Sequence, residues 1–153
     1  MMQFKGAALK IREVVMVKLP RKDADITLKV ASIPLGLKRE YDALFPRPKP
    51  PVSITVKAGG KQEKEENWDD ENFVKAFDEW KYLQNIYTFY RVLEADENVK
   101  FDHNPSDLPS LRAFASELKD SGISDGDLAI VLSQAAIASN ITEEAIANAR
   151  SSF

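Results

Sequence analysis

The 153-residue sequence contains no cysteine and a single histidine. Without cysteine the chain can form no disulfide, no thiolate metal site and no cysteine nucleophile. No apolar run reaches the ~18 residues that a membrane-spanning helix needs, and residues 1–9 are too short and too mixed for a secretory signal. We therefore expect a cytoplasmic protein without a membrane partner.

Motifs for catalysis and for cofactor binding are also missing. The sequence has no G-x-S-x-G, no dinucleotide fingerprint and no pair of histidines at metal-ligand spacing. His103 follows Asp102 in a stretch typical of a solvated turn, and residues 58–61 lack the first glycine and the Ser/Thr of a phosphate loop. Stretches starting at Asp102 and Asp120 lack the Gly and Glu of a calcium loop. We expect no enzyme: no catalytic residue, no metal and no cofactor.

Charge is divided unevenly along a chain of ordinary globular composition, with 44% hydrophobic and 29% charged residues. Residues 1–58 hold 12 Lys and Arg against 5 Asp and Glu, a net charge of +7. Residues 59–153 hold 9 against 19, a net charge of −10. This asymmetry is consistent with weak attraction inside one molecule and with head-to-tail association between copies. The length fits a single domain over residues 1–153.

The part from residue 1 to 58 is predicted to be rich in β-structure. Residues 14–19, 26–30 and 52–56 are β-branched or alternate between apolar and polar, which predicts two or three antiparallel strands with one apolar face. Such a small sheet needs a helix across that face. A short helix is expected over residues 37–45. The proline-rich segment 46–51 predicts a stiff spacer or, alternatively, a ligand for a proline-recognition domain. Residues 59–68 predict a flexible polar loop.

The part from residue 69 to 153 is predicted to be helical. Residues 73–94 contain neither glycine nor proline, which predicts a long helix. Asn67 or Asp69 is expected to cap its N-terminal end. This helix is apolar around most of its circumference, so it must be covered on several sides or bind a partner. A stripe along one side supplies the candidate partner contacts, with a place in the core as the alternative: Phe73, Phe77, Trp80 and Tyr87. The nearly opposite side carries Tyr82, Ile86, Phe89 and Leu93.

Three short helices are expected to follow the long one. The first has Pro109 in its opening turn, the second begins at Ser124 with a capping box to Asp127, and the last begins at Thr142. The first two have the lengths of a helix-turn-helix. The second would open with acidic residues and holds no Lys or Arg through residue 140, so DNA would repel it. The sequence thus predicts an α+β fold: a small antiparallel sheet of two or three strands packed on a long central helix, followed by three short helices.

The order of these segments resembles the tail assembly chaperones of long-tailed bacteriophages and prophages. The matching pieces begin with an early strand at 26–30, a Leu/Tyr helix with a proline-rich stretch at 35–51 and a polar Gly/Lys/Glu loop at 58–67. They continue with an acidic aromatic helix start within 70–94 and with small C-terminal helices at 121–128 and 141–144. The resemblance implies a cytoplasmic protein of the bacterial host that binds the tape measure protein, keeping its hydrophobic helices soluble until tail tube protein polymerises around them. It also implies a longer form made by programmed frameshifting.

Two other functions stay open at this point. A structural virion component, such as a neck subunit or a tail-completion connector, is the first alternative. A DNA-binding regulator with a helix-turn-helix is the second, although the acidic second helix argues against nucleic acid as a partner.

Overall fold

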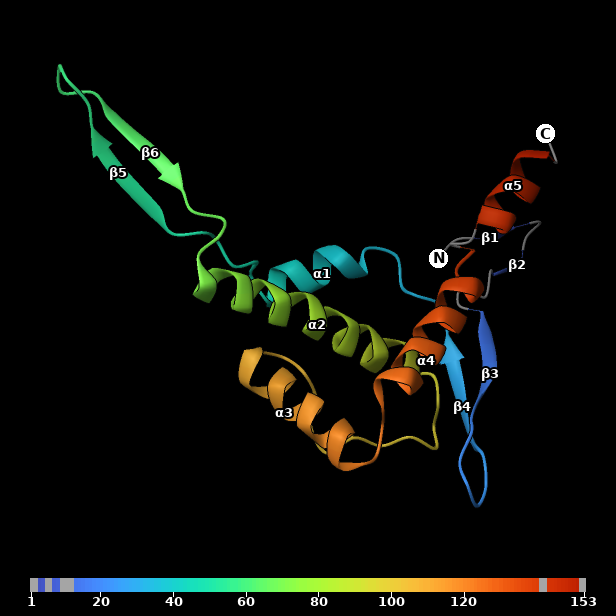
Figure 1. Cartoon of the computed structure of the whole chain (residues 1–153). Helices are drawn as coiled ribbons and strands as arrows, with labels where there is room; N and C mark the ends of the chain where they lie inside the picture. The colour runs from blue at the N-terminus through green and yellow to red at the C-terminus, as the bar shows by residue number, and fades with distance from the viewer. Residues whose placement is uncertain (1–2, 5–6, 9–12, 141–142, 152–153) are drawn as a thin grey trace.

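The computed structural model describes residues 3–4, 7–8, 13–140 and 143–151 (Figure 1). They form an α+β fold, as predicted. None of the helices in these ranges is long and apolar enough to cross a membrane. Along the chain the elements are β1 (Gln3–Phe4), β2 (Ala7–Ala8), β3 (Val14–Leu19), β4 (Ile26–Ala31), α1 (Leu37–Leu44), β5 (Val52–Val56), β6 (Gln62–Glu66), α2 (Glu71–Leu93), α3 (Leu108–Asp120), α4 (Asp125–Ala138) and α5 (Glu143–Ser151).

Helix α2 is the central element. Its N-cap is Asp70, whose carboxylate accepts a hydrogen bond of 2.9 Å from the backbone N–H of Phe73. The prediction that Asn67 or Asp69 caps this helix is therefore wrong. Helices α1 and α3 lie along two sides of α2, while α4 and the β3–β4 strands lie at its C-terminal end (Figure 1). The core forms where these elements meet; its largest fully enclosed side chains are Tyr41, Phe89, Phe114, Leu19, Leu93 and Leu111.

Strands β3 and β4 form an antiparallel two-stranded sheet with Val17 opposite Leu28. Alternate side chains point to one face, and this face is buried against α4 and α2 because it carries the apolar set Val17, Leu19, Leu28 and Val30. The small sheet therefore contacts both the central helix α2 and helix α4.

Strand β5 forms where the sequence predicts a third strand, but it does not join β3 and β4. It pairs instead with β6, with Ile54 opposite Lys64, in a separate two-stranded hairpin. Residues 62–66 therefore form a strand, and the prediction of a flexible loop across 59–68 is wrong for them. Gly59 and Gly60 turn the chain with φ of 94° and 80°, a conformation that glycine adopts without steric cost. The hairpin extends beyond the N-terminal end of α2 (Figure 1).

The helices after α2 begin as the sequence predicts. Ser124 and Asp127 form a capping box at the start of α4, and Asp107 forms one with Ser110 at the start of α3, where Pro109 occupies the first turn. Helix α5 is present, but Thr142, the residue expected to begin it, lies outside the described residues.

Candidate functional site: an aromatic row and an apolar hairpin

Tyr87, one of the four predicted partner contacts, lies in the core. Its side chain is only 3% exposed and packs against the rings of Tyr41 and Phe45. Its hydroxyl donates a hydrogen bond to Glu40 of α1, which also pairs with Arg91. Burial raises the pKa of Tyr87 well above its usual range, and the hydrogen bond to the Glu40 carboxylate adds to this effect. Tyr87 therefore joins α1 to α2, and a partner cannot reach it in this fold.

The other three predicted contacts form a continuous row of rings with Trp68, which precedes α2. The ring centroids are 5.5 Å apart between Trp68 and Phe73, 5.8 Å between Phe73 and Phe77, and 5.9 Å between Phe77 and Trp80. Phe73 is buried by its neighbours, Phe77 and Trp80 are half-buried, and Trp68 is 55% exposed. We call Trp68, Phe73, Phe77 and Trp80 the aromatic row. Much of its ring surface lies outside the core.

The inner end of the aromatic row is held in place by hydrogen bonds. The indole N–H of Trp80 donates to the carbonyl oxygen of Phe45 at 2.7 Å, and the backbone oxygen of Trp80 accepts from the hydroxyl of Tyr41 at 2.5 Å. A buried indole N–H needs such a partner. Trp80 therefore has a fixed orientation, with one part of its ring against the core and the other toward solvent.

Two cations lie over the middle of the aromatic row. The guanidinium carbon of Arg47 is 4.8 Å from the ring centroid of Phe77 and 5.8 Å from that of Trp80. The ammonium of Lys81 is 5.1 Å from the centroid of Phe77. Each is at cation–π distance, so long movable side chains cover part of the Phe77 ring, and Arg47 also covers part of the Trp80 ring.

A small pocket of about 160 Å³ opens beside Trp80, lined by residues of the proline-rich segment, of α2 and of the start of α3. Arg112 and Glu79 form an ion pair of 2.6 Å at its rim. Its lining is mostly apolar: Leu44, Phe45, Pro46, Pro48, Ala76, Trp80, Leu83 and Leu108. The pocket has the size and lining to receive a single large apolar side chain from a partner.

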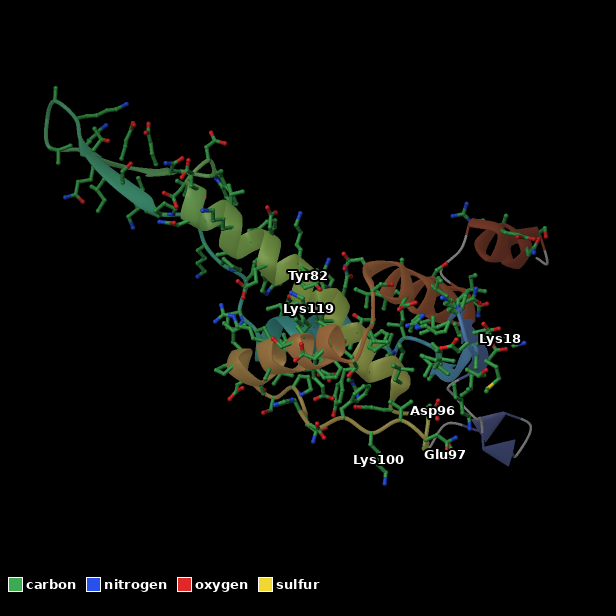
Figure 2. The ribbon with its side chains drawn as sticks, turned by 60° about the horizontal axis from the view of Figure 1, so that its bottom comes forward. Lys18, Tyr82, Asp96, Glu97, Lys100 and Lys119 are labelled. Carbon is green, nitrogen blue, oxygen red and sulfur yellow. The ribbon has the colours of Figure 1, made fainter. Side chains whose placement is uncertain are left out.

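The β5–β6 hairpin carries a second uncovered apolar surface. Val52, Ile54 and Val56 lie on one face of β5, because alternate residues of a strand point the same way, and they are 51%, 58% and 67% exposed. The side chains of both strands extend into open space (Figure 2). We call Val52, Ile54 and Val56 the hairpin face. Sequence reasoning placed these residues in the core sheet and so missed them as a surface.

The opposite side of α2 is mostly buried. Ile86, Phe89 and Leu93 belong to the core, whereas Tyr82 stays at the surface next to Lys119 of α3 (Figure 2). A groove of about 570 Å³ runs there between α2, α3 and the start of α4. Apolar side chains such as Ile86, Leu118 and Leu128 line it together with the polar Ser124 and Asp125. The exposed large apolar side chains of α2 are Val74 and Tyr82, whereas Phe77 and Trp80 are half-buried, so apolar surface remains near Tyr82 as well as on the aromatic row.

His103 has a structural partner. Its ring Nδ1 lies 2.8 Å from Glu117, whose carboxylate also accepts the backbone N–H groups of Asp102 and His103. Partial burial raises the pKa of Glu117, but the hydrogen bonds from His103 and from these backbone groups outweigh it, so the pKa lies below its usual value. These contacts fasten the loop after α2 to α3. The residues that the structure describes contain no group of three metal-ligating side chains.

Helix α4, the predicted reading helix of a helix-turn-helix, is packed between the β3–β4 sheet and α2. Its exposed residues include Asp125, Ile130 and Ile137, and it carries no cation. Asp127 is paired with Arg21 and is not free to contact a base. Helix α4 therefore presents no cation that could contact the phosphates of DNA.

Comparison with known proteins finds no matching family model, no similar curated sequence and no similar solved structure. The function must therefore be inferred from the chemistry of the aromatic row, the pocket beside Trp80 and the hairpin face.

Proposed function

We propose that this chain is a non-enzymatic tail assembly chaperone that works in the cytoplasm of a bacterial host. Its client would be the tape measure protein of a long-tailed phage or prophage, held soluble until tail tube protein polymerises around it. The order of segments that resembles this family supports the proposal. The residues outside the core add a physical reason for it.

The observation that carries the proposal is the apolar surface that this fold leaves uncovered. A two-stranded hairpin in water has marginal stability, and the hairpin face lacks any helix to cover it. The aromatic row begins at Trp68, directly after the hairpin, and continues along α2 to the pocket beside Trp80. The exposed part of this surface is the hairpin face and Trp68, and neighbouring exposed apolar side chains are typical of a protein-binding site.

The shape of the aromatic row suits a helical client. Amphipathic helices bind in apolar grooves through side chains spaced three or four residues apart. Phe77 and Trp80, the half-buried members of the row on α2, are three residues apart, so a client helix lying along α2 can pack against both. One of its large apolar side chains can enter the pocket beside Trp80. The cations Arg47 and Lys81 would then pair with acidic residues on the client's polar edge.

Co-expression with a helical tape-measure fragment tests the proposal. We expect the fragment to stay soluble and to co-purify with the wild-type chain. Combined replacement of Val52, Ile54 and Val56 by threonine keeps β-branched side chains but makes the hairpin face polar, so recovery of the fragment should fall. The matched control exchanges Ser53→Thr and Thr55→Ser on the opposite face and should recover the fragment as the wild type does. An insoluble fragment with nothing co-purified would refute the proposal.

The protruding hairpin also suits a structural virion subunit, since an arm of this kind can lock neighbouring subunits together. Mass spectrometry of purified phage particles separates the two functions. A chaperone should be absent from mature tails, whereas a neck or connector subunit should be present at a fixed ratio to the other tail proteins.

A further inference from the structure

We propose that two copies of this chain associate through the free edge of β5, which pairs antiparallel with β5 of the second copy to form a four-stranded sheet. The pairing is centred on Ile54, so that Ile54 lies opposite the partner's Ile54, and Val52 opposite the partner's Val56. This association does not depend on the client of the proposed function.

The backbone of β5 offers a complete set of unpaired groups at that edge. Two hydrogen bonds bracket the hairpin ladder: Lys57 N–H to the Lys61 carbonyl at 2.8 Å and Asn67 N–H to the Pro51 carbonyl at 2.9 Å. Because bonded residues alternate along an antiparallel strand, residues 51, 53, 55 and 57 face β6. The N–H and C=O groups of Val52, Ile54 and Val56 therefore point outward, where a second strand can bond to them.

The edges of β3, β4 and β6 are protected in ways that β5 is not. On β4, the outward N–H of Lys29 already donates to the buried carboxylate of Asp96 at 2.8 Å, and Asp96 and Glu97 lie beside the sheet in the loop after α2 (Figure 2). The outward positions of β6 include Lys64 and Glu66, and those of β3 include Lys18. Charged residues on an edge oppose strand addition, and β5 has none within its bounds.

The sequence of β5 favours a second copy as the occupant because it is self-complementary. Read in either direction, residues 52–56 alternate branched apolar and hydroxyl side chains, Val-Ser-Ile-Thr-Val. A two-fold axis at Ile54 places Val against Val, and places Ser53 against the partner's Thr55, a pair that can hydrogen-bond across strands. It also matches the patch to itself, as a closed two-fold interface requires.

Charge along the hairpin supports the antiparallel direction. The tip carries Lys61 and also Lys57, which pairs with Glu63 at 2.8 Å, while the end of β6 leads into the acidic run Glu65, Glu66, Asp69, Asp70 and Glu71. Antiparallel pairing places the two tips, and likewise the two acidic runs, at opposite ends of the four-stranded sheet. The strongly charged β6 strands are then kept apart at the two outer edges of the four-stranded sheet. A parallel arrangement would place like charges together instead.

The first experiment measures the mass of the full chain by sedimentation across a concentration series, and we expect a dimer. Ile54→Pro removes an outward N–H of β5 and should leave a monomer. Lys64→Pro is the matched control, because it removes an outward N–H at the directly opposite position on β6; it should remain a dimer. Circular dichroism should show the same helix content in all three proteins. A monomeric wild type, a dimer that survives Ile54→Pro, or a ladder of larger species would each overturn the proposal.

The second experiment fixes the register. The chain has no cysteine of its own, so Ser53→Cys and Thr55→Cys can be prepared separately and mixed under oxidising conditions. In the proposed register these positions form a non-hydrogen-bonded pair with Cα atoms about 4.5 Å apart, within disulfide range. The mixture should form covalent dimer about tenfold faster than either variant alone, whose equivalent positions are diagonal across the two strands. Equal rates in all three samples would contradict this register.

Discussion

Arg21 and Asp127 lie 106 positions apart in the sequence, and their side chains meet at 2.7 Å. Asp127 accepts two hydrogen bonds from the guanidinium while it closes the capping box of α4 with Ser124. The capping role could be predicted from the local pattern of Ser124 and Asp127, because capping depends on neighbours in sequence. The ion pair could not, because it depends on the tertiary packing of the β3–β4 turn against α4.

We predict that the contribution of Asp127 to stability depends on pH. The hydrogen bond from Arg21 outweighs partial desolvation and lowers the pKa of Asp127 from 3.8 to about 2. A carboxyl with a lowered pKa in the folded state stabilises the protein above pH ~4, and this stabilisation is lost as the pH falls toward 2. In urea unfolding, Asp127→Asn should therefore be less stable than the wild type by about 1–2 kcal/mol at pH 7. An equal difference at pH 2 would contradict the assignment.

A second prediction separates packing from binding on α2. Tyr87→Ala removes a core ring and its hydroxyl, so it should lower the free energy of unfolding by about 3 kcal/mol. Phe77→Ala removes a half-buried ring of the aromatic row and should cost about 1 kcal/mol. Client recovery should nevertheless fall more for Phe77→Ala, when both variants are assayed well below their melting temperatures. The opposite order of recovery would place the client on a different surface.

At the scale of elements, the helices and the strands β3 and β4 follow from the sequence because each has a local signal. The β5–β6 hairpin shows where such signals stop. The alternation of residues 52–56 predicts β5, and Gly59-Gly60 between two short segments is a hairpin signal. The segment Gln62–Glu66 has no apolar face, so its composition favours a loop. It becomes a strand because β5 supplies backbone hydrogen bonds, a tertiary effect that composition does not record.

The hairpin should be removable without loss of the fold. Every residue of its two strands is exposed, and its ends are adjacent because Asn67 N–H bonds to the Pro51 carbonyl. Replacement of residues 52–66 by a short glycine linker should leave the melting temperature within a few degrees of the wild type. Differential scanning calorimetry measures this directly. A large drop in melting temperature would mean that the hairpin stabilises the core, and would remove the argument that it serves a partner.

At the scale of the whole molecule, the opposite charges of the two halves are partly paired within one chain. Among the described residues, three ion pairs join a cation of the basic part to a carboxylate of the acidic part: Arg21 with Asp127, Lys29 with Glu97 and Lys57 with Glu63. These contacts are attractive interactions inside one molecule, as composition leads one to expect. Head-to-tail association between copies stays a prediction. It differs from β5 pairing, because head-to-tail contacts form a ring or a filament, whereas a two-fold contact is complete with two copies.

The aromatic row could be foreseen in part at this scale. Its spacing on one side of α2 is visible in the sequence, but periodicity alone cannot tell which members face the core. Phe73 and Phe77 continue from the exposed Trp68, Trp80 meets Tyr41 of α1 with one side of its ring, and Tyr87 is enclosed against α1. That division depends on where α1 lies, which is a property of the assembled fold.

Hydrogen exchange of the full chain with and without a helical tape-measure fragment tests the central claim most directly. In the free protein, the amides of α3 and α4 should exchange slowly. On binding, protection should increase over residues 52–56 and 68–80, which hold the hairpin face and the aromatic row, with little change in α3 and α4. Protection confined to α3 and α4, or a complex that leaves both surfaces unprotected, would contradict the account.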